Sequence, residues 1–306
     1  MALNYDQVTA ITEKYFLPVL ADNFFDSNPL LKRAKAKFYK SVDGGERIVM
    51  PLGYAALSGS GWYSGSDVLS TTDNQTVTAA ELFWKQCYAN VTISRMEELK
   101  NSGKAQIISL VKSKMKTAEK TMNSKMGTGL WNAGTTTDAI IGLRAWLSTS
   151  STVGGISQTT NSWFQSQVDS TTTVLSLAAM QSLYNSASID NDIPTCAFTT
   201  RTIYDLYYAL LQPQQRFVDS ETAKGGFKSL MFNGIPLISD SYCPASHLAF
   251  LNEDYTHLFY HKDENFKMSP FVTPVNQNVR SGKIFWAGAF GINNPRMQGL
   301  MSAITA

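Results

Sequence analysis

The segment Ser94–Leu130, SRMEELKNSGKAQIISLVKSKMKTAEKTMNSKMGTGL, contains the longest helical pattern in the chain. It opens with the spacing of a capping box, in which the Ser94 hydroxyl accepts a backbone N–H and the Glu97 carboxylate reaches back to the start of the helix. An Asn-Ser-Gly triplet then interrupts the pattern, and we expect Gly103 to act as a hinge because glycine tolerates many backbone conformations. The segment therefore predicts a short capped turn followed by a longer helix.

From Lys104 to about Leu130 the pattern predicts one amphipathic helix, roughly 40 Å long at 1.5 Å per residue. Apolar residues recur every three or four positions and form one stripe: Ile107, Val111, Met115, Ala118, Met122 and Met126. Most lysines lie off this stripe: Lys112, Lys114, Lys116, Lys120 and Lys125. These lysines form either a solvated face or a surface that meets nucleic-acid phosphates without reading sequence.

A long β-hairpin precedes this helix. One strand is predicted over Arg47–Tyr54, the tip is SGSGWYSGSD, and the return strand is predicted over Thr76–Ile93 from its alternating pattern. Isolated two-stranded ribbons are marginally stable in water, so we expect another subunit to cover the hairpin. Aromatic side chains suit such interfaces, and the candidate interface residues at the tip are Trp62, Tyr63 and Asp67.

The N-terminal 45 residues read as an arm rather than as a domain. A short amphipathic segment lies near Val8–Leu20, and Asn28-Pro29 is a turn signal. A basic run follows: Lys32, Arg33, Lys35, Lys37 and Lys40. It is either a solvated face or a contact with an acidic partner, such as a neighbouring subunit or nucleic acid. Lys32 and Arg33 are the interface candidates in this run.

The remaining chain mixes helices and strands. The stretches GTTTDAIIGLRAWL and STVGGI indicate strand and loop, while Thr173–Ser186 and Thr202–Leu211 indicate helices. Phe232–Asp240 reads as a turn into a strand, and residues 253–306 are rich in strand patterns. With no repeat and no linker, these patterns predict an α+β protein.

Composition limits the classes of function. Hydrophobic residues make up 43% of the 306 residues and charged residues 16%, which is below the ~25% charge of typical soluble domains. Neutral polar residues supply the rest of the surface, which favours a subunit that packs against neighbours over a free enzyme. The formal net charge of +2 excludes a dedicated nucleic-acid binder. No signal peptide and no membrane span is recognisable, so we expect a protein made in the cytosol.

Residues able to carry catalysis or bind metal are sparse. Cys87, Cys196 and Cys243 are widely separated and form no CxxC, which predicts free thiols, mostly buried. His257 and His261 could begin a zinc site, but a closed site needs four ligands and no supporting motif is present. No GxSxG, GxGxxG or GxxxxGK[ST] occurs. We expect no active site, no cofactor and no bound metal.

The order of these segments, from arm to hairpin, long helix, mixed region and β-rich end, resembles the major capsid proteins of tailed bacteriophages, which have the Hong-Kong-97-type fold. Local sequences add to the likeness. NPLLKRAK is similar to the end of the N-arm, IVMPL, WYSG and TVTAAELFWKQ to the extended loop, and ISRMEELKN with the helix after it to the spine helix. FNGIPLISDSYCP and FWAG with NNPRMQG are similar to strands of the axial and peripheral domains. The likeness covers essentially the whole chain.

The resemblance implies an α+β, Hong-Kong-97-type capsid fold with an N-arm, an extended β-hairpin loop, a spine helix, and peripheral and axial domains. The implied boundaries are 1–45 for the N-terminal arm, 46–84 for the extended loop, 85–131 with 253–290 for the peripheral domain, and 132–252 with 291–306 for the axial domain.

The function that this resemblance implies is structural, not enzymatic. The chain would assemble with copies of itself as hexamers and pentamers into an icosahedral shell around double-stranded phage DNA. Assembly would take place in the bacterial cytoplasm, and the product would be the capsid of the virion. Expected partners are a portal and, since the arm begins directly at Met1, a separate scaffolding protein; a decoration protein is a further candidate.

One departure and one alternative qualify this interpretation. Some members of the family cross-link a Lys of the extended loop to an Asn of a neighbour, but residues 48–80 contain no Lys. We therefore expect a shell held by non-covalent contacts. An encapsulin-like compartment, which shares the fold and encloses cargo enzymes, stays open as the alternative, and a cargo-docking groove would distinguish it.

Overall fold

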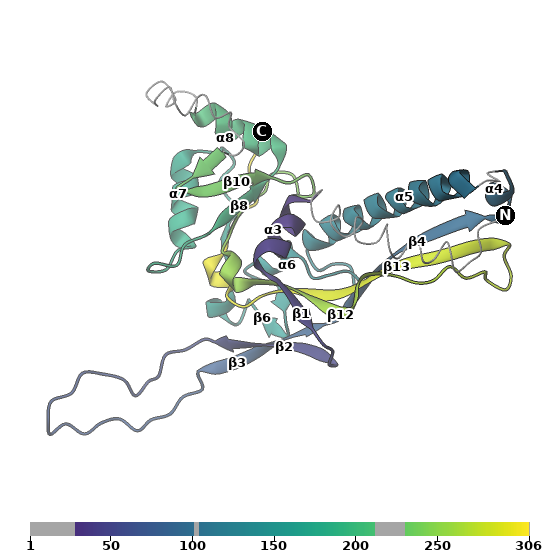
Figure 1. The fold of residues 1–306 in the computed structure, drawn as a ribbon. Helices are drawn as coiled ribbons and strands as arrows, with labels where there is room; N and C mark the ends of the chain where they lie inside the picture. Colours follow the sequence, from purple (N-terminus) through teal and green to yellow (C-terminus); the bar gives the residue numbers. More distant parts are fainter. Residues whose placement is uncertain (1–27, 101–103, 212–229, 306) are drawn as a thin grey trace.

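The structure, a computed structural model, describes residues 28–100, 104–211 and 230–305. Figure 1 shows a central body. A long hairpin extends from it on one side, and a long helix with long strands extends on the other. A separate lobe carries the C-terminal end. The amphipathic segment expected at Val8–Leu20 and the hinge expected at Gly103 lie outside the described residues. Within the described part, no helix is long and apolar enough to cross a membrane.

The first sheet has four strands in the order β1-β12-β13-β4. Their bounds are Tyr39–Val42 for β1, Thr256–Met268 for β12, Val279–Ile292 for β13 and Lys85–Ser94 for β4. β1 runs parallel to β12, and the other pairs are antiparallel. The long strands β12 and β13 confirm the strand-rich C-terminal region predicted from the sequence.

The helix α5 (Lys104–Leu130) lies along β4 (Figure 1) and confirms the long helix predicted from the apolar stripe. Of the stripe, Val111, Met115, Ala118, Met122 and Met126 are all buried. Burial of each of the larger side chains contributes roughly 1.5–3 kcal/mol relative to exposure. Because these side chains are buried, the apolar face of α5 is fixed toward the core.

The capping box is also confirmed. The Ser94 hydroxyl accepts the backbone N–H of Met96 at 3.3 Å, and the Glu97 carboxylate accepts the backbone N–H of Ser94 at 3.1 Å. This cap starts the short helix α4 (Arg95–Lys100) directly after β4.

The second sheet has six strands in the order β7-β14-β11-β8-β10-β9. Their bounds are Gln167–Asp169 for β7, Gly299–Met301 for β14, Leu248–Leu251 for β11, Cys196–Thr199 for β8, Ile235–Ser239 for β10 and Leu230–Phe232 for β9. The helices α7 (Leu177–Ser186) and α8 (Arg201–Leu211) belong to this lobe (Figure 1). The turn into a strand that Phe232–Asp240 predicted is confirmed as the β9–β10 hairpin.

The hairpin corrects one prediction. Thr76–Ile93 is not a single return strand, because β3 (Val77–Phe83) pairs with β2 (Arg47–Gly53), whereas β4 pairs with β13. Alternation changes phase between them: even-numbered residues such as Leu82 are buried in β3, and odd-numbered residues such as Val91 in β4. The break falls at Trp84, whose indole N–H donates to the Gly45 carbonyl at 2.7 Å.

Two further boundaries differ from expectation. The helix predicted from Thr173 begins at Leu177, because the Ser176 side chain caps it by accepting the N–H of Ala179. The stretch expected as strand and loop contains a short helix, α6 (Leu143–Trp146), before the two-residue strands β5 (Thr152–Val153) and β6 (Ile156–Ser157). The described residues also contain the short 3-10 helices η2 (Ser162–Phe164), η4 (Glu253–Tyr255) and η5 (Pro295–Met297).

Buried apolar side chains form two clusters, one around α5 and the first sheet and one under α7, α8 and the second sheet. The described part of the predicted arm belongs to the first cluster. The helix α3 (Pro29–Lys37), capped by Asn28, buries Leu30, Leu31 and Ala34 there, and β1 follows it into the first sheet. The division into peripheral and axial domains stays a prediction.

Candidate assembly surfaces and the junction between the sheets

The hairpin tip is the most exposed part of the described chain. Between β2 and β3, residues 54–76 form no regular strand and extend away from the body (Figure 1). The two limbs are tied by their own polar groups: Ser58 N–H donates to Asn74 Oδ1 at 2.9 Å, and Asn74 Nδ2 donates to the Ala56 carbonyl at 3.0 Å. These hydrogen bonds join the two limbs of the loop to each other. The loop extends away from the body and does not fold back onto it (Figure 1).

Apolar side chains on this loop are left in solvent. Trp62 is 106% exposed and Val68 99%, and Tyr63 is exposed as well. Asp67 makes only a local turn, in which its carboxylate accepts the N–H of Ser64 at 2.7 Å. The structure thus brings the predicted tip residues onto one loop, where another chain can reach them, and their interface role stays a prediction.

The two interface candidates of the basic run differ in their surroundings. Lys32 is exposed on α3. Arg33 turns inward and forms a two-pronged ion pair with Glu253, with Nε and NH2 each 2.6 Å from a carboxylate oxygen. This contact raises the pKa of Arg33, and the Glu253 side chain is only 4% exposed. Within the described chain Arg33 therefore has an intramolecular role, which the sequence did not reveal.

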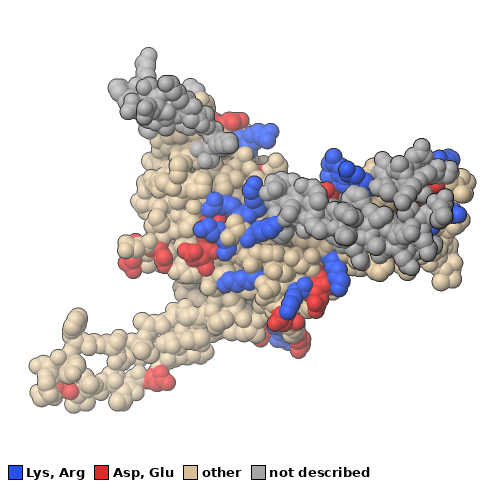
Figure 2. Space-filling view, viewed as in Figure 1, with Lys and Arg blue, Asp and Glu red and all other residues tan. Residues whose placement is uncertain are grey.

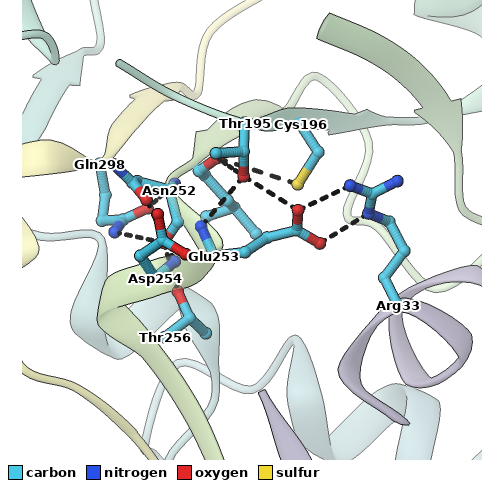
Figure 3. A network of polar contacts seen from close by, with 9 residues as sticks. Arg33, Thr195, Cys196, Asn252, Glu253, Asp254, Thr256 and Gln298 are labelled. Carbon is cyan, nitrogen blue, oxygen red and sulfur yellow. Dashed lines mark hydrogen bonds and ion pairs between the residues drawn. The ribbon is translucent and has the colours of Figure 1, made fainter. Parts of the chain in front are cut away.

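Figure 3 shows that this ion pair is part of a larger network at the junction of the two sheets. Glu253 also accepts the Thr195 hydroxyl at 3.0 Å, and its own N–H donates to Thr195 Oγ1 at 3.1 Å. Beside it, Asn252 N–H donates to Gln298 Oε1 at 2.7 Å, and Gln298 Nε2 donates back to the Asn252 carbonyl at 3.1 Å. Buried charges are tolerated only when such partners are present.

The position of this network follows from the topology. The chain passes from β11 of the second sheet to β12 of the first through η4, and returns from β13 to β14 through η5. The Asn252–Gln298 pair joins these two crossings, and Arg33 attaches α3 to the first of them. The network therefore fixes how the two sheets sit against each other.

A second buried carboxylate ties the end of α5 to the second sheet. Asp240, 1% exposed, accepts the indole N–H of Trp131 at 3.0 Å and the N–H of Tyr242 at 2.9 Å. Burial raises the pKa of Asp240, and the two donors oppose that rise. Tyr242 packs so closely on Gly127 of α5 that a Cβ there would lie 2.4 Å from its ring. The helix end is thus fixed to the second lobe by a hydrogen bond and a close contact.

The lysines of α5 lie mostly on its solvent side. Lys112, Lys116 and Lys120 are exposed, and Lys114 pairs with Glu97 at 3.1 Å. Figure 2 shows basic side chains gathered over the body, whereas the hairpin loop carries acidic side chains and no basic ones.

The histidines and cysteines of the described chain form no metal-binding cluster. No cluster of three or more His, Cys, Asp or Glu side chains among the described residues could hold a metal ion. All three cysteines are free thiols, as predicted, and burial raises the pKa of Cys196 and Cys243. His257 is buried beside Phe259 and its pKa is lowered to about 4, chiefly by burial and then by Lys40.

Comparison with known proteins identifies the fold. No family model and no curated protein matches this sequence. Among solved structures, the capsid of cyanophage A-1(L) is 16% identical with a TM-score of 0.67, covering 90% of this chain and 93% of that one. The capsid of a native GTA particle is 11% identical with a TM-score of 0.63, covering 89% of each chain. An encapsulin, SrpI from Synechococcus elongatus, is 9% identical with a TM-score of 0.56, covering 89% of this chain and 87% of that one. This α+β chain therefore has the fold of phage major capsid proteins.

Proposed function

We propose that this chain is the major capsid protein of a tailed bacteriophage, a structural subunit that assembles with its own copies as hexamers and pentamers into an icosahedral shell around double-stranded DNA. The single observation that carries the proposal is the extended loop 54–76, on which the apolar side chains of Trp62 and Val68 are fully exposed and not covered by any described part of the chain. A monomer gains nothing from such a loop, because exposed apolar surface favours association. The capsid fold over about nine-tenths of the chain supports the same conclusion.

The chemistry of the described residues agrees with a mechanical role. The buried polar groups Glu253 and Asp240 are held by donors of the same chain and serve the fold. Contacts between subunits are repeated many times in a closed shell, so modest pairwise energies are sufficient for assembly. In this proposal the subunits are held without covalent cross-links, since the loop has no Lys. A portal, a separate scaffolding protein and non-specific DNA contacts through surface lysines complete it.

Negative-stain microscopy of the expressed protein, with and without a scaffolding protein, tests this proposal. We expect closed shells of uniform diameter. A small monodisperse species under every assembly condition would exclude a shell function. Shells that protect double-stranded DNA from nuclease in infected cells would identify a phage head.

An encapsulin-like compartment is the second candidate, because an encapsulin shares the fold over most of this chain. The two functions differ in what the shell encloses. Purified shells that contain a co-purifying enzyme and no nuclease-protected DNA would favour the compartment over the phage head.

A further inference from the structure

Strand β4 forms one edge of the first sheet, and no strand of the described residues pairs with its outer side. Proteins usually shorten, bulge or charge such an edge, because its free backbone groups can pair with another strand. The opposite edge strand, β1, has only four residues. β4 has ten residues in regular register with β13, and after Lys85 it carries no charge and no Pro. The β4 edge is therefore able to accept a further strand.

The ladder between β4 and β13 shows which backbone groups of β4 point outward. The N–H and C=O of Lys283 bond Ser269, at 2.9 and 2.7 Å, on the side away from β4. Asn90 lies opposite Lys283, so its own N–H and C=O point away from β13. The same alternation applies to Thr92, which lies opposite Ser281. No described residue forms a hydrogen bond with these outward backbone groups.

A groove of about 270 Å³ lies between this edge and α5. The hydroxyls of Thr117 and Thr121 on α5 bond carbonyls of their own helix, at 3.1 and 3.0 Å. This wall therefore requires no polar partner from a ligand. Side chains of an added strand would enter the groove at every second position, and small or β-branched ones suit its size. The lining residues are Ala89, Asn90, Val91, Thr92, Lys114, Thr117, Ala118 and Thr121.

The other face of the edge, away from α5, carries an exposed lysine. Lys283 lies opposite Asn90, and its Nζ is 6.0 Å from the ring centroid of Tyr88, which is 65% exposed. None of the ion pairs among the described residues involves Lys283. The nearby carboxylate of Glu97 already pairs with Lys114 at 3.1 Å. An added strand with acidic side chains on this face would therefore complement the charge.

We propose that the β4 edge binds an extended acidic segment of a separate protein, which adds a fifth strand to the first sheet. The backbone of this segment pairs with Asn90 and Thr92, as in other cases of strand addition. Its small side chains enter the groove beside α5, and the acidic side chains between them face Lys283. The β4 strand of a second copy fits less well, because it would bring a second Lys283 to the same face. The inference goes beyond the proposed shell function and does not involve the hairpin loop.

A labelled peptide tests this edge in the full-length subunit. The probe alternates Thr and Glu over the length of β4, and the matched control peptide has Lys in place of each Glu. Fluorescence polarisation measures binding, and hydrogen exchange measures protection of the backbone amides. We expect saturable binding of the acidic peptide alone, with slower exchange in residues 86–94. Binding without this protection contradicts the inference. Protection that rises with the concentration of the subunit alone would assign the edge to a second copy instead.

Two substitutions test whether binding uses the backbone and the lysine. Asn90→Pro removes an outward N–H and no bond to β13, a position at which edge strands tolerate Pro. Asn90→Ala is the matched control, since it removes the same side chain and keeps the N–H. The Pro variant should bind the acidic peptide at least fivefold more weakly than the Ala variant, the ratio that corresponds to one hydrogen bond of ~1 kcal/mol.

Lys283→Glu should reverse the preference, so that the Lys peptide binds more tightly than the acidic one. This variant keeps the test decisive if Asn90→Pro does not fold. Equal binding by the Pro and Ala variants, or an unchanged preference in Lys283→Glu, overturns the inference. Failure of the unchanged protein to form shells contradicts the proposed function instead, because the peptide measurements need only the subunit.

Discussion

The hairpin loop 54–76 and the junction around Glu253 differ in where their apolar and polar side chains find partners. The loop leaves apolar side chains such as Trp62 and Val68 in solvent, and its polar groups form hydrogen bonds within the loop itself. At the junction, side chains far apart in sequence meet in a buried, hydrogen-bonded network (Figure 3). Under the proposed function the loop is complete only with a partner, whereas the polar groups of the junction are paired within one chain. This difference separates residues proposed to serve assembly from residues that serve the fold.

The largest expected effect concerns the loop. Residues 54–76 can be replaced by an Asn-Gly turn, because Gly53 and Val77 pair in register and a two-residue turn joins such strands. We expect the subunit to keep its melting temperature within a few degrees and to lose shell formation completely. Thermal unfolding and electron microscopy measure the two effects. Normal shells from this variant would show that the loop has no role in assembly.

At the junction, Arg33→Met should destabilise the subunit strongly. It leaves the buried Glu253 carboxylate without its cation, and breaking a buried pair costs about 3–5 kcal/mol; the remaining Thr195 donor places the expectation near the lower end. Urea unfolding measures the loss. The matched control is Arg47→Met, because Arg47 pairs with Glu81 in solvent, where an ion pair is worth about 1 kcal/mol or less. Equal losses would contradict the distinction between buried and exposed pairs.

Acid should weaken the junction through His257, the second residue of β12. Its pKa is lowered to about 4 in the folded chain, against about 6.5 in an unfolded one. Between these pH values the unfolded chain binds a proton that the folded chain does not, so stability falls as pH falls from about 6.5 to 4. The loss should be on the order of 1–2 kcal/mol after allowance for solvent screening. His257→Gln should flatten unfolding free energy against pH over this interval, and an unchanged slope would assign the dependence to other groups.

The smallest expected effect is Val68→Ala on the loop. Val68 is 99% exposed, so its truncation should change the unfolding free energy by no more than about 0.5 kcal/mol. The same substitution at Val91, 2% exposed on β4, should cost about 1–3 kcal/mol. Chemical denaturation of the two variants compares identical changes in the two environments. A comparable loss at Val68 would mean that the loop is packed within its own chain.

The sequence predicted correctly those elements whose residues follow a single local spacing. The stripe of α5 and the capping box at Ser94 need only neighbours three or four residues away, and both are confirmed. The break at Trp84 becomes visible only once burial is known, because the buried positions change there from even to odd residue numbers. The order of the segments along the chain sufficed to predict the fold.

The junction could not be predicted in the same way. Arg33 and Glu253 are 220 positions apart, and Asn252 and Gln298 are 46 apart. No period or motif relates such residues, because their proximity results from the completed topology. The same holds for the pocket beside the base of the hairpin, whose walls come from separate parts of the chain. A basic run such as Lys32-Arg33 looks uniform in sequence, and only the folded chain separates the exposed Lys32 from Arg33, which pairs with the buried Glu253.

The pair of crossings between the sheets also has a mechanical consequence. Because η4 and η5 both join the first sheet to the second, and the chain from β4 through α5 to β7 joins them again, a force that pulls the lobes apart is divided between covalent connections acting in parallel. The reciprocal Asn252–Gln298 bonds run from one crossing to the other. Sliding of one strand past its neighbour would load both bonds at once, in shear, rather than one after the other. A wall built of such subunits would yield first at the contacts between copies, and each subunit would survive the rupture folded.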